Sequence, residues 1–295
     1  MKGASDDDRQ NEIKELLRTA MACQQDQHGE SFPAMNEHAP DHSPVILVTG
    51  ATSGFGEAIA RTFAGLGWRV LATGRRTERL DRLQADLGPD KLFPLVMDVR
   101  DRRAVADTIA RVEQEHAAID VLVNNAGLAL GLEPAHQADL DEWEIMIDTN
   151  VKGLVFMTRA ILPGMVSRGT GHVVNIGSTA GSYPYPGGNV YGATKAFVRQ
   201  FSLNLRADLL GTGVRVTDVS PGMSGGTEFS RTRFRGDADR AAGVYQDTQP
   251  LTPDDIAEAV RWVVTLPKHV NANAIELMPV CQAAGPLAVY RKPSA

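Results

Sequence analysis

The pattern of hydrophobic and polar residues changes near residue 44. From there onward, short runs of branched apolar residues alternate with longer segments in which apolar residues recur at helical spacing. The apolar runs cover residues 44–50, 68–74, 92–99, 120–127, 172–178, 214–222 and 274–280. These runs are apolar throughout rather than in every second position, so they predict strands that are covered on both faces, as in a parallel sheet.

The regular alternation of strand and helix predicts the fold class. Strand, helix and strand follow one another without a break, which is typical of a doubly wound α/β domain with helices on both faces of one sheet. We therefore expect a Rossmann-type, seven-stranded parallel sheet. Residues 44–295 contain no internal linker and are predicted to form one domain.

Residues 1–43 have a different pattern. They are polar, with an acidic cluster at residues 6–8 and only one short amphipathic stretch. A segment with so little apolar surface does not fold alone, so we expect a mobile N-terminal extension. An alternative is a start codon assigned too far upstream, with Met21 or Met35 nearer the natural beginning.

Composition and charge exclude several classes of function. The chain has 295 residues, a net charge of -6 and a pI of about 5.7. This acidic balance does not suggest a nucleic-acid-binding protein, which is typically basic. No apolar run approaches the roughly 18 residues that cross a bilayer, and the N-terminus lacks a signal-peptide pattern. The cysteines, Cys23 and Cys281, indicate no disulfide framework, so a cytoplasmic location is expected. The spacing of the N-terminal histidines, His28, His38 and His42, fits no metal site.

The candidate chemistry lies at the ends of the predicted strands, because doubly wound sheets bind ligands there. The first strand runs into the turn TGATSGFGE, whose glycines allow a tight bend and a close approach to phosphate before a helix begins. Helix packing alone could also require such glycines. In this position we interpret the turn as a dinucleotide site, which comprises Gly50, Ala51, Thr52, Ser53, Gly54, Phe55 and Gly56.

The next two strand ends bear on the choice of cofactor. After the second strand, an NAD enzyme places an acidic residue for the ribose hydroxyl, but this chain has Arg75 and Arg76. Two guanidinium groups suit a 2′-phosphate, so NADP(H) is favoured over NAD(H), although two solvated arginines are the alternative. Asp98, at the third strand end, could accept a hydrogen bond from adenine or cap the following helix.

A possible proton-transfer site follows the fifth strand. Ser178 lies at its end, and Tyr191 and Lys195 are one helical turn apart in the segment after it. A nearby cation favours the phenolate of a tyrosine, which could then exchange a proton with a hydroxyl or carbonyl oxygen held by Ser178. Most YxxxK pairs lie on protein surfaces, but the upstream serine and the nucleotide turn favour a catalytic role here.

These segments together resemble one family. TGATSGFGE, NNAG, DTNVKG, IGSTAG and YGATK occur in order within residues 44–290, as in the short-chain dehydrogenase/reductase family. Longer segments, including ATGRRTERL and HVNANAIELMPV, are similar to its NADP-dependent 3-hydroxy acid dehydrogenases. That resemblance implies action on serine, allo-threonine or 3-hydroxypropionate, and reduction of malonic semialdehyde.

The resemblance also implies roles for the matching residues. Tyr191 would transfer the proton, Lys195 would lower its pKa and hold the nicotinamide ribose, and Ser178 would bind the reacting oxygen. Asn150 would keep a water molecule that relays protons to Lys195. The remaining implied cofactor contacts are the turn at 50–55 with pyrophosphate, Arg75 and Arg76 with the 2′-phosphate, Asp98 and Val99 with adenine, Asn125 with ribose, and Pro221, Gly222 and Thr227 over the nicotinamide. Relatives are usually homotetramers.

The substrate is indicated less directly. Residues 223–251 contain no clear strand, and long loops of this kind are often lids. A substrate carboxylate needs a cation, and Arg231, Arg233 and Arg235 lie in this loop, with Arg233 the first choice. Tyr183 and Tyr185 suggest a narrow pocket or merely pack its rim.

Two alternative functions remain open at this stage. One is a reductase of another small carbonyl or of a 3-oxoacyl thioester. The other is a protein that senses NADP(H) without catalysis, but such proteins typically lose the serine, tyrosine or lysine that this chain retains.

Overall fold

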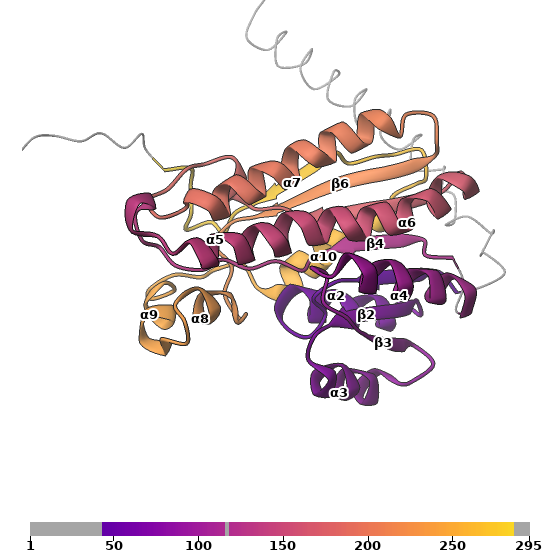
Figure 1. Cartoon of the computed structure of the whole chain (residues 1–295), viewed down its shortest axis with the longest axis horizontal. Coiled ribbons are helices and arrows are strands. Elements are labelled where there is room, and N and C mark those ends of the chain that lie inside the picture. The colour runs from indigo at the N-terminus through magenta and orange to yellow at the C-terminus, as the bar shows by residue number, and fades with distance from the viewer. Residues whose placement is uncertain (1–42, 116–117, 286–295) are drawn as a thin grey trace, which may run out of the picture. The chain divides into compact units, whose positions relative to one another are not determined.

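The computed structural model describes residues 43–115 and 118–285 (Figure 1). The predicted mobile extension lies, apart from Ser43, outside the described residues. The part of the chain from Ser43 onward forms one compact unit, and its first strand begins at Val45.

The centre of the fold is one parallel sheet of seven strands in the order β3-β2-β1-β4-β5-β6-β7. The strands are β1 (Val45–Val48), β2 (Arg69–Gly74), β3 (Leu92–Val96), β4 (Val121–Asn124), β5 (Gly171–Ile176), β6 (Val214–Pro221) and β7 (Ala274–Leu277). All seven predicted strands are present, so the predicted fold class is confirmed. The strand order reverses between β1 and β4, the point at which doubly wound sheets bind ligands.

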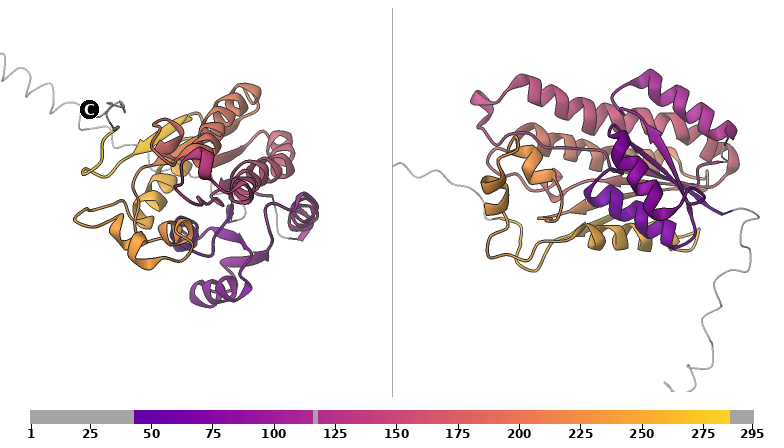
Figure 2. Two further views of the ribbon diagram at one scale, coloured as in Figure 1. Left: turned by 60° about the vertical axis from the view of Figure 1, so that its left-hand side comes forward. Right: turned by 90° about the horizontal axis from the view of Figure 1, so that it is seen from below.

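Helices cover both faces of the sheet (Figures 1 and 2). One face carries α2 (Gly54–Gly65), α3 (Thr77–Leu87) and α10 (Pro253–Thr265), and the other carries α4 (Arg102–Glu115), α6 (Leu154–Arg168) and α7 (Asn189–Asp208). Each layer therefore buries its own hydrophobic core against the sheet.

Strand β1 explains why the apolar runs do not alternate. All four of its residues are buried. Ile46 and Val48 belong to the core beneath α2 and α10, whereas Val45 and Leu47 belong to the core beneath α4 and α6. Successive side chains of a strand point to opposite faces, so a strand covered on both faces must be apolar at every position.

Shorter elements gather at the carboxyl edge of the sheet. They are η1 (Ala135–Gln137), α5 (Leu140–Ile147), the π-helical segment η2 (Asp148–Gly153), η3 (Thr179–Gly181), α8 (Phe229–Arg233) and α9 (Ala238–Gly243). The π-helical segment joins α5 to α6 without interruption. The loop at 223–251 was predicted to lack strands. It contains α8 and α9, which the sequence pattern did not reveal, and one isolated bridge between Ser224 and Leu251.

Two further observations concern the described part of the chain. No helix there is both long and apolar enough to cross a membrane. Nor do these same residues bring together three or more His, Cys, Asp or Glu side chains that could hold a metal ion. The histidines at positions 28, 38 and 42 lie outside the described residues.

Candidate active site

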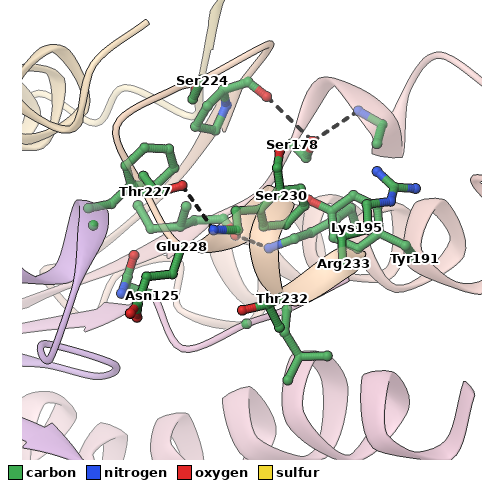
Figure 3. A pocket seen from close by; sticks show the side chains of 18 of the residues that line it. Asn125, Ser178, Tyr191, Lys195, Ser224, Thr227, Glu228, Ser230, Thr232 and Arg233 are labelled. Atoms are coloured by element: carbon green, nitrogen blue, oxygen red, sulfur yellow. Dashed lines mark hydrogen bonds between the residues drawn. The ribbon is translucent and has the colours of Figure 1, made fainter. Parts of the chain in front are cut away.

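A cavity of about 810 Å³ opens at the carboxyl edge of the sheet (Figure 3). It brings together residues from the ends of all seven strands and from the loop at 223–251. The predicted site residues that line it are Gly50, Thr52, Ser53, Gly54, Phe55, Arg75, Arg76, Asp98, Val99, Asn125, Ser178, Tyr185, Tyr191, Lys195, Pro221, Gly222, Thr227 and Arg233. Ala51, Gly56 and Asn150 are not among the residues that line the cavity.

The glycine-rich turn has the geometry of a phosphate cradle. Gly50 and Gly54 adopt positive φ angles of 67° and 54°, a conformation that favours glycine. A Cβ on Gly56 would come within 2.3 Å of the Gly50 carbonyl oxygen, so the start of α2 can approach the turn only with glycine there. Asn125 donates a hydrogen bond of 2.8 Å to the Thr49 carbonyl and fixes the turn from behind. The residues therefore fit a dinucleotide whose pyrophosphate faces the N-terminus of α2.

The two predicted phosphate-binding arginines do not point to the same place. Arg75 is exposed, and its Nη1 lies 3.9 Å from Asp98. Arg76 turns toward the glycine turn, where its Nη2 donates to the Thr52 hydroxyl at 2.8 Å and to the Ser53 hydroxyl at 3.0 Å. Arg79, one turn further along α3, reaches the same region and donates to the Thr52 carbonyl. Arg79 was not among the predicted site residues, although its spacing of three residues from Arg76 on a helix indicates that the two share one face.

Asp98 is positioned by arginines rather than by a helix terminus. Arg100 donates to its carboxylate at 2.7 Å, and this hydrogen bond lowers the pKa of Asp98. The alternative prediction that Asp98 caps the next helix is wrong. Asp101 accepts hydrogen bonds from the backbone amides of Arg103 and Ala104 at the start of α4 and acts as the cap. Asp98 stays at the rim of the cavity, where an adenine contact was predicted.

The predicted proton-transfer residues converge at the end of β5. Ser178 precedes η3, and its hydroxyl accepts a hydrogen bond from the Ala180 amide at 3.1 Å. Tyr191 and Lys195 lie one turn apart on α7, and both are buried. The Lys195 ammonium donates to the Ile176 carbonyl at 2.8 Å, two residues before Ser178. The three side chains thus face one small volume, as Figure 3 shows.

The electrostatics of this group differ from the prediction. Lys195 was expected to lower the pKa of Tyr191, but burial raises that pKa to about 12, while a hydrogen bond with Ser178 and the charge of Arg233 act in the opposite direction. The Lys195 ammonium is 6.0 Å from the Tyr191 ring centre because it turns toward the Ile176 carbonyl. Burial also lowers the pKa of Lys195 to about 8. Removal from water disfavours the charged form of both groups.

Asn150 lies in the π-helical segment and is almost fully buried. Its side chain accepts from the Leu128 amide at 2.9 Å and donates to the Leu128 carbonyl and to the Thr194 hydroxyl. A Cβ built on Gly127 would lie 3.2 Å from the Asn150 Oδ1 and 3.5 Å from the Lys195 Nζ, so both residues flank Gly127. Asn150 is therefore close to Lys195, and its side chain holds the loop after β4.

The three candidate arginines of the 223–251 loop, Arg231, Arg233 and Arg235, have separate surroundings. Arg233 lies in the cavity, where its Nη2 donates to the Tyr185 hydroxyl at 2.8 Å and its guanidinium carbon is 5.6 Å from the Tyr191 ring centre. Arg235 donates to Glu142 at 2.6 Å. Arg231 is exposed. Only Arg233 of this trio is close to the proton-transfer residues.

Tyr183, the other tyrosine predicted to narrow the pocket, has a different position from Tyr185. Tyr183 bonds to Glu276 of β7 at 3.0 Å, so it packs at the rim.

The segment after β6 closes the cavity over the glycine turn. Ser178 is 3.4 Å from the Pro221 carbonyl, and a Cβ on Gly54 would meet the Thr227 side chain at 3.1 Å. Gln282, beyond β7, accepts from the Met223 amide at 2.6 Å and fixes the start of this segment. No local signal in the sequence pointed to Gln282, because its partner is 59 residues away.

A dinucleotide-dependent hydride transfer needs a phosphate cradle and a proton-transferring group at one sheet edge. The site has both, which places the chain among the nicotinamide-dependent oxidoreductases with a Rossmann-type fold. More particularly, residues 44–238 match the family described as short chain dehydrogenase, and the chain belongs to this family. The predicted family is thereby confirmed.

Similar proteins cover nearly the whole described region. The NADP-dependent 3-hydroxy acid dehydrogenase YdfG of Escherichia coli (strain K12) is 62% identical over 248 residues, covering 84% of this chain and 100% of the relative. Sulfoacetaldehyde reductase 2 of Chromohalobacter salexigens is 51% identical over 251 residues, covering 84% and 99%. A solved structure described as the closed form of serine dehydrogenase complexed with NADP+ is 62% identical with a TM-score of 0.82, covering 84% and 100%.

Proposed function

We propose that the protein interconverts a short 3-hydroxy acid and the corresponding 3-oxo acid. Serine, allo-threonine and 3-hydroxypropionate are the proposed hydroxy acids, and malonic semialdehyde is a proposed oxo acid. The observation that carries this proposal is the position of Arg233, whose guanidinium lies over the Tyr191 ring inside the cavity. A cation so close to the proton-transfer residue suits a substrate whose carboxylate is near its reacting carbon.

The cofactor and the enzyme class are supported by the similar proteins. Relatives at 62% identity are NADP-dependent, and one solved structure holds NADP+. The predictions of NADP(H) as cofactor and of an oxidoreductase acting on hydroxyl groups are thereby confirmed. When bound, NADP(H) supplies or accepts the hydride at its nicotinamide ring.

The chain's own residues would manage the proton. With a pKa of about 12, the Tyr191 phenol carries its proton at neutral pH and can give it to a carbonyl oxygen in the reductive direction. The Ser178 hydroxyl would hold that oxygen, and the Lys195 ammonium would stabilise the phenolate that remains. In the oxidative direction the same phenolate takes the proton of the substrate hydroxyl.

Arg233 is held in a fixed orientation. Its Nε donates to the Gly131 carbonyl at 3.1 Å, and its Nη2 donates to the Tyr185 hydroxyl. A guanidinium fixed in this way would anchor a carboxylate two carbons from the carbinol and orient that carbon toward the nicotinamide. Positioning of this kind lowers the barrier to reaction.

A sulfonate is the second candidate for the anchored anion. One relative at 51% identity is a sulfoacetaldehyde reductase, and a guanidinium binds a sulfonate as well as a carboxylate. Isethionate and 3-hydroxypropionate differ only in this anionic group, so their comparison separates the two candidates. Other small carbonyls and 3-oxoacyl thioesters remain alternative substrates.

The experiment compares NADP+-linked kcat/KM for 3-hydroxypropionate, its methyl ester and isethionate. Wild type should prefer the acid, and Arg233→Gln should erase that preference by raising KM, with a loss of roughly 10- to 100-fold for a charge-assisted bond of about 1.5–3 kcal/mol. Arg231→Gln, on the same helix but exposed, is the matched control, and Tyr191→Phe is the inactive control. Equal rates for acid and ester in wild type would overturn the proposal.

We also propose that the protein is a cytoplasmic homotetramer. The tetramer is proposed from the family resemblance, because family members usually form tetramers, and the location from the cysteine content. Sedimentation velocity of the full chain would test the assembly, and a monomer at micromolar concentration would contradict it.

A further inference from the structure

One carboxylate of the 223–251 loop lies between two cations of the nucleotide site. Glu228 accepts a hydrogen bond from Arg76 Nη1 at 2.7 Å through one carboxylate oxygen and from Arg79 Nη2 at 2.8 Å through the other. Although burial works in the other direction, these two arginines lower the pKa of Glu228 to about 2. The carboxylate is therefore ionised across the physiological range.

The position of Glu228 ties this ion pair to the cofactor turn. Glu228 directly follows Thr227, whose side chain lies against Gly54. Arg76 and Arg79 both contact Thr52 of the same turn. Glu228 also precedes α8, the helix that ends at Arg233, so the phosphate side and the substrate side of the cavity are joined by one short helix.

Most of the Arg76 donors are already engaged. Its Nε and Nη2 bond to the Thr52 hydroxyl, its Nη2 also reaches Ser53, and its Nη1 bonds to Glu228. A 2′-phosphate carries about one and a half to two negative charges and binds best to guanidinium groups that donate to it directly. A 2′-phosphate that binds through Arg76 and Arg79 therefore competes with Glu228 for these donors.

We propose that Glu228 is an internal competitor of the cofactor's 2′-phosphate and thereby a determinant of cofactor affinity. Its carboxylate holds Arg76 and Arg79 and keeps the start of α8 on the nucleotide turn. A 2′-phosphate displaces it and loosens that end of α8. Because such coupling is reciprocal, any change that strengthens the Glu228 ion pairs weakens binding of the phosphate by the same factor.

The test measures binding rather than turnover. Calorimetry with 2′,5′-ADP and with 5′-AMP isolates the contribution of the 2′-phosphate in the full chain. Glu228→Gln should bind 2′,5′-ADP about tenfold more tightly than wild type, since it removes a charge-assisted competitor worth on the order of one such bond. Its affinity for 5′-AMP should stay within about twofold, because that ligand has no 2′-phosphate to compete.

Two further variants make the result specific. Glu258→Gln removes a similar ion pair, with Arg261 on α10, and should behave as wild type with both ligands. Arg79→Gln should weaken 2′,5′-ADP but not 5′-AMP. Unchanged or weaker binding of 2′,5′-ADP to Glu228→Gln would overturn the proposal, and so would an equal gain for both ligands.

A second readout concerns the loop itself. In wild type, 2′,5′-ADP should increase amide hydrogen exchange over residues 228–235, whereas Glu228→Gln should exchange fast there with or without the ligand. Protection of these residues by 2′,5′-ADP in wild type would overturn the displacement.

Discussion

At the scale of single residues, burial decides the charge states of the site. The pKa values of Tyr191 and Lys195 move in opposite directions, to about 12 and about 8, for one reason: both side chains lie out of water. Sequence spacing correctly predicted that the two would share a helix face. It could not predict that the ammonium turns to the Ile176 carbonyl, because that contact depends on how α7 lies on β5.

The Lys195 ammonium should make stability depend on pH. Its pKa is 10.5 in an unfolded chain and about 8 in the folded one. Between these values the unfolded state binds more protons, so the free energy of unfolding rises with pH across this window. Relative to Lys195→Met, wild type should gain up to about 3 kcal/mol from pH 7.5 to pH 10.5, at about 1.36 kcal/mol per pKa unit.

Urea denaturation of both proteins at several pH values measures this gain. Lys152→Met is the matched control, because Lys152 is exposed and its pKa is raised by Asp148. The difference in the free energy of unfolding between wild type and Lys152→Met should not rise between pH 7.5 and pH 10.5. A difference between wild type and Lys195→Met that does not change with pH would contradict the prediction.

At the scale of elements, the sequence predicted the strands but not the short helix α8. The central strands were predicted because burial on both faces keeps them apolar, whereas the edge strand β7 was predicted from its apolar run although its residues are only half-buried or exposed. The helix α8 was missed because it is a five-residue helix held by tertiary contacts, such as that of Arg233 with Gly131. Arg76 was found from its place after β2, but its partner Glu228 is 152 residues away, beyond any local pattern.

The contact between α2 and the glycine turn should be sensitive to one methyl group. A Cβ on Gly56 would collide with the Gly50 carbonyl, so Gly56→Ala should cost about 1–3 kcal/mol of stability and weaken NADP(H) binding. Gly65, at the other end of α2, has nothing within 4 Å of its added Cβ. Gly65→Ala should therefore be neutral or slightly stabilising. Thermal unfolding and cofactor titration of the two variants check this, and equal effects would refute it.

At the scale of the whole molecule, three arginines lie close together at the predicted cofactor site. The chain carries a net charge of -6, yet Arg75, Arg76 and Arg79 gather at one edge of the sheet. Strand order brings them together with the proton-transfer residues, which lie about 100 residues later in the sequence. The domain from residue 44 onward therefore contains all the residues that the proposed reaction uses.

Removal of residues 1–42 should leave the enzyme intact. This polar segment has little apolar surface to bury, so the melting temperature should change by less than about 2–4 °C, the shift that 1 kcal/mol causes in a domain of this size. Turnover with NADP(H) should be equal to that of the full chain. Calorimetry and steady-state rates of both forms test this, and a loss of many degrees would show that the segment docks on the fold.

The π-helical segment between α5 and α6 rotates the apolar face of one helix relative to that of the other within one continuous helical segment. A π turn contains one residue more than an α turn, and one residue corresponds to about 100° of rotation. Before the segment, Met146 on α5 packs with Ala129 and Tyr191 beside the site. After it, Met157 and Ile161 on α6 pack on the sheet. A single extra residue thus turns α5 toward the site and α6 toward the sheet. Deleting one residue from the π-helical segment would therefore turn the apolar side chains of one of the two helices away from its packing partner.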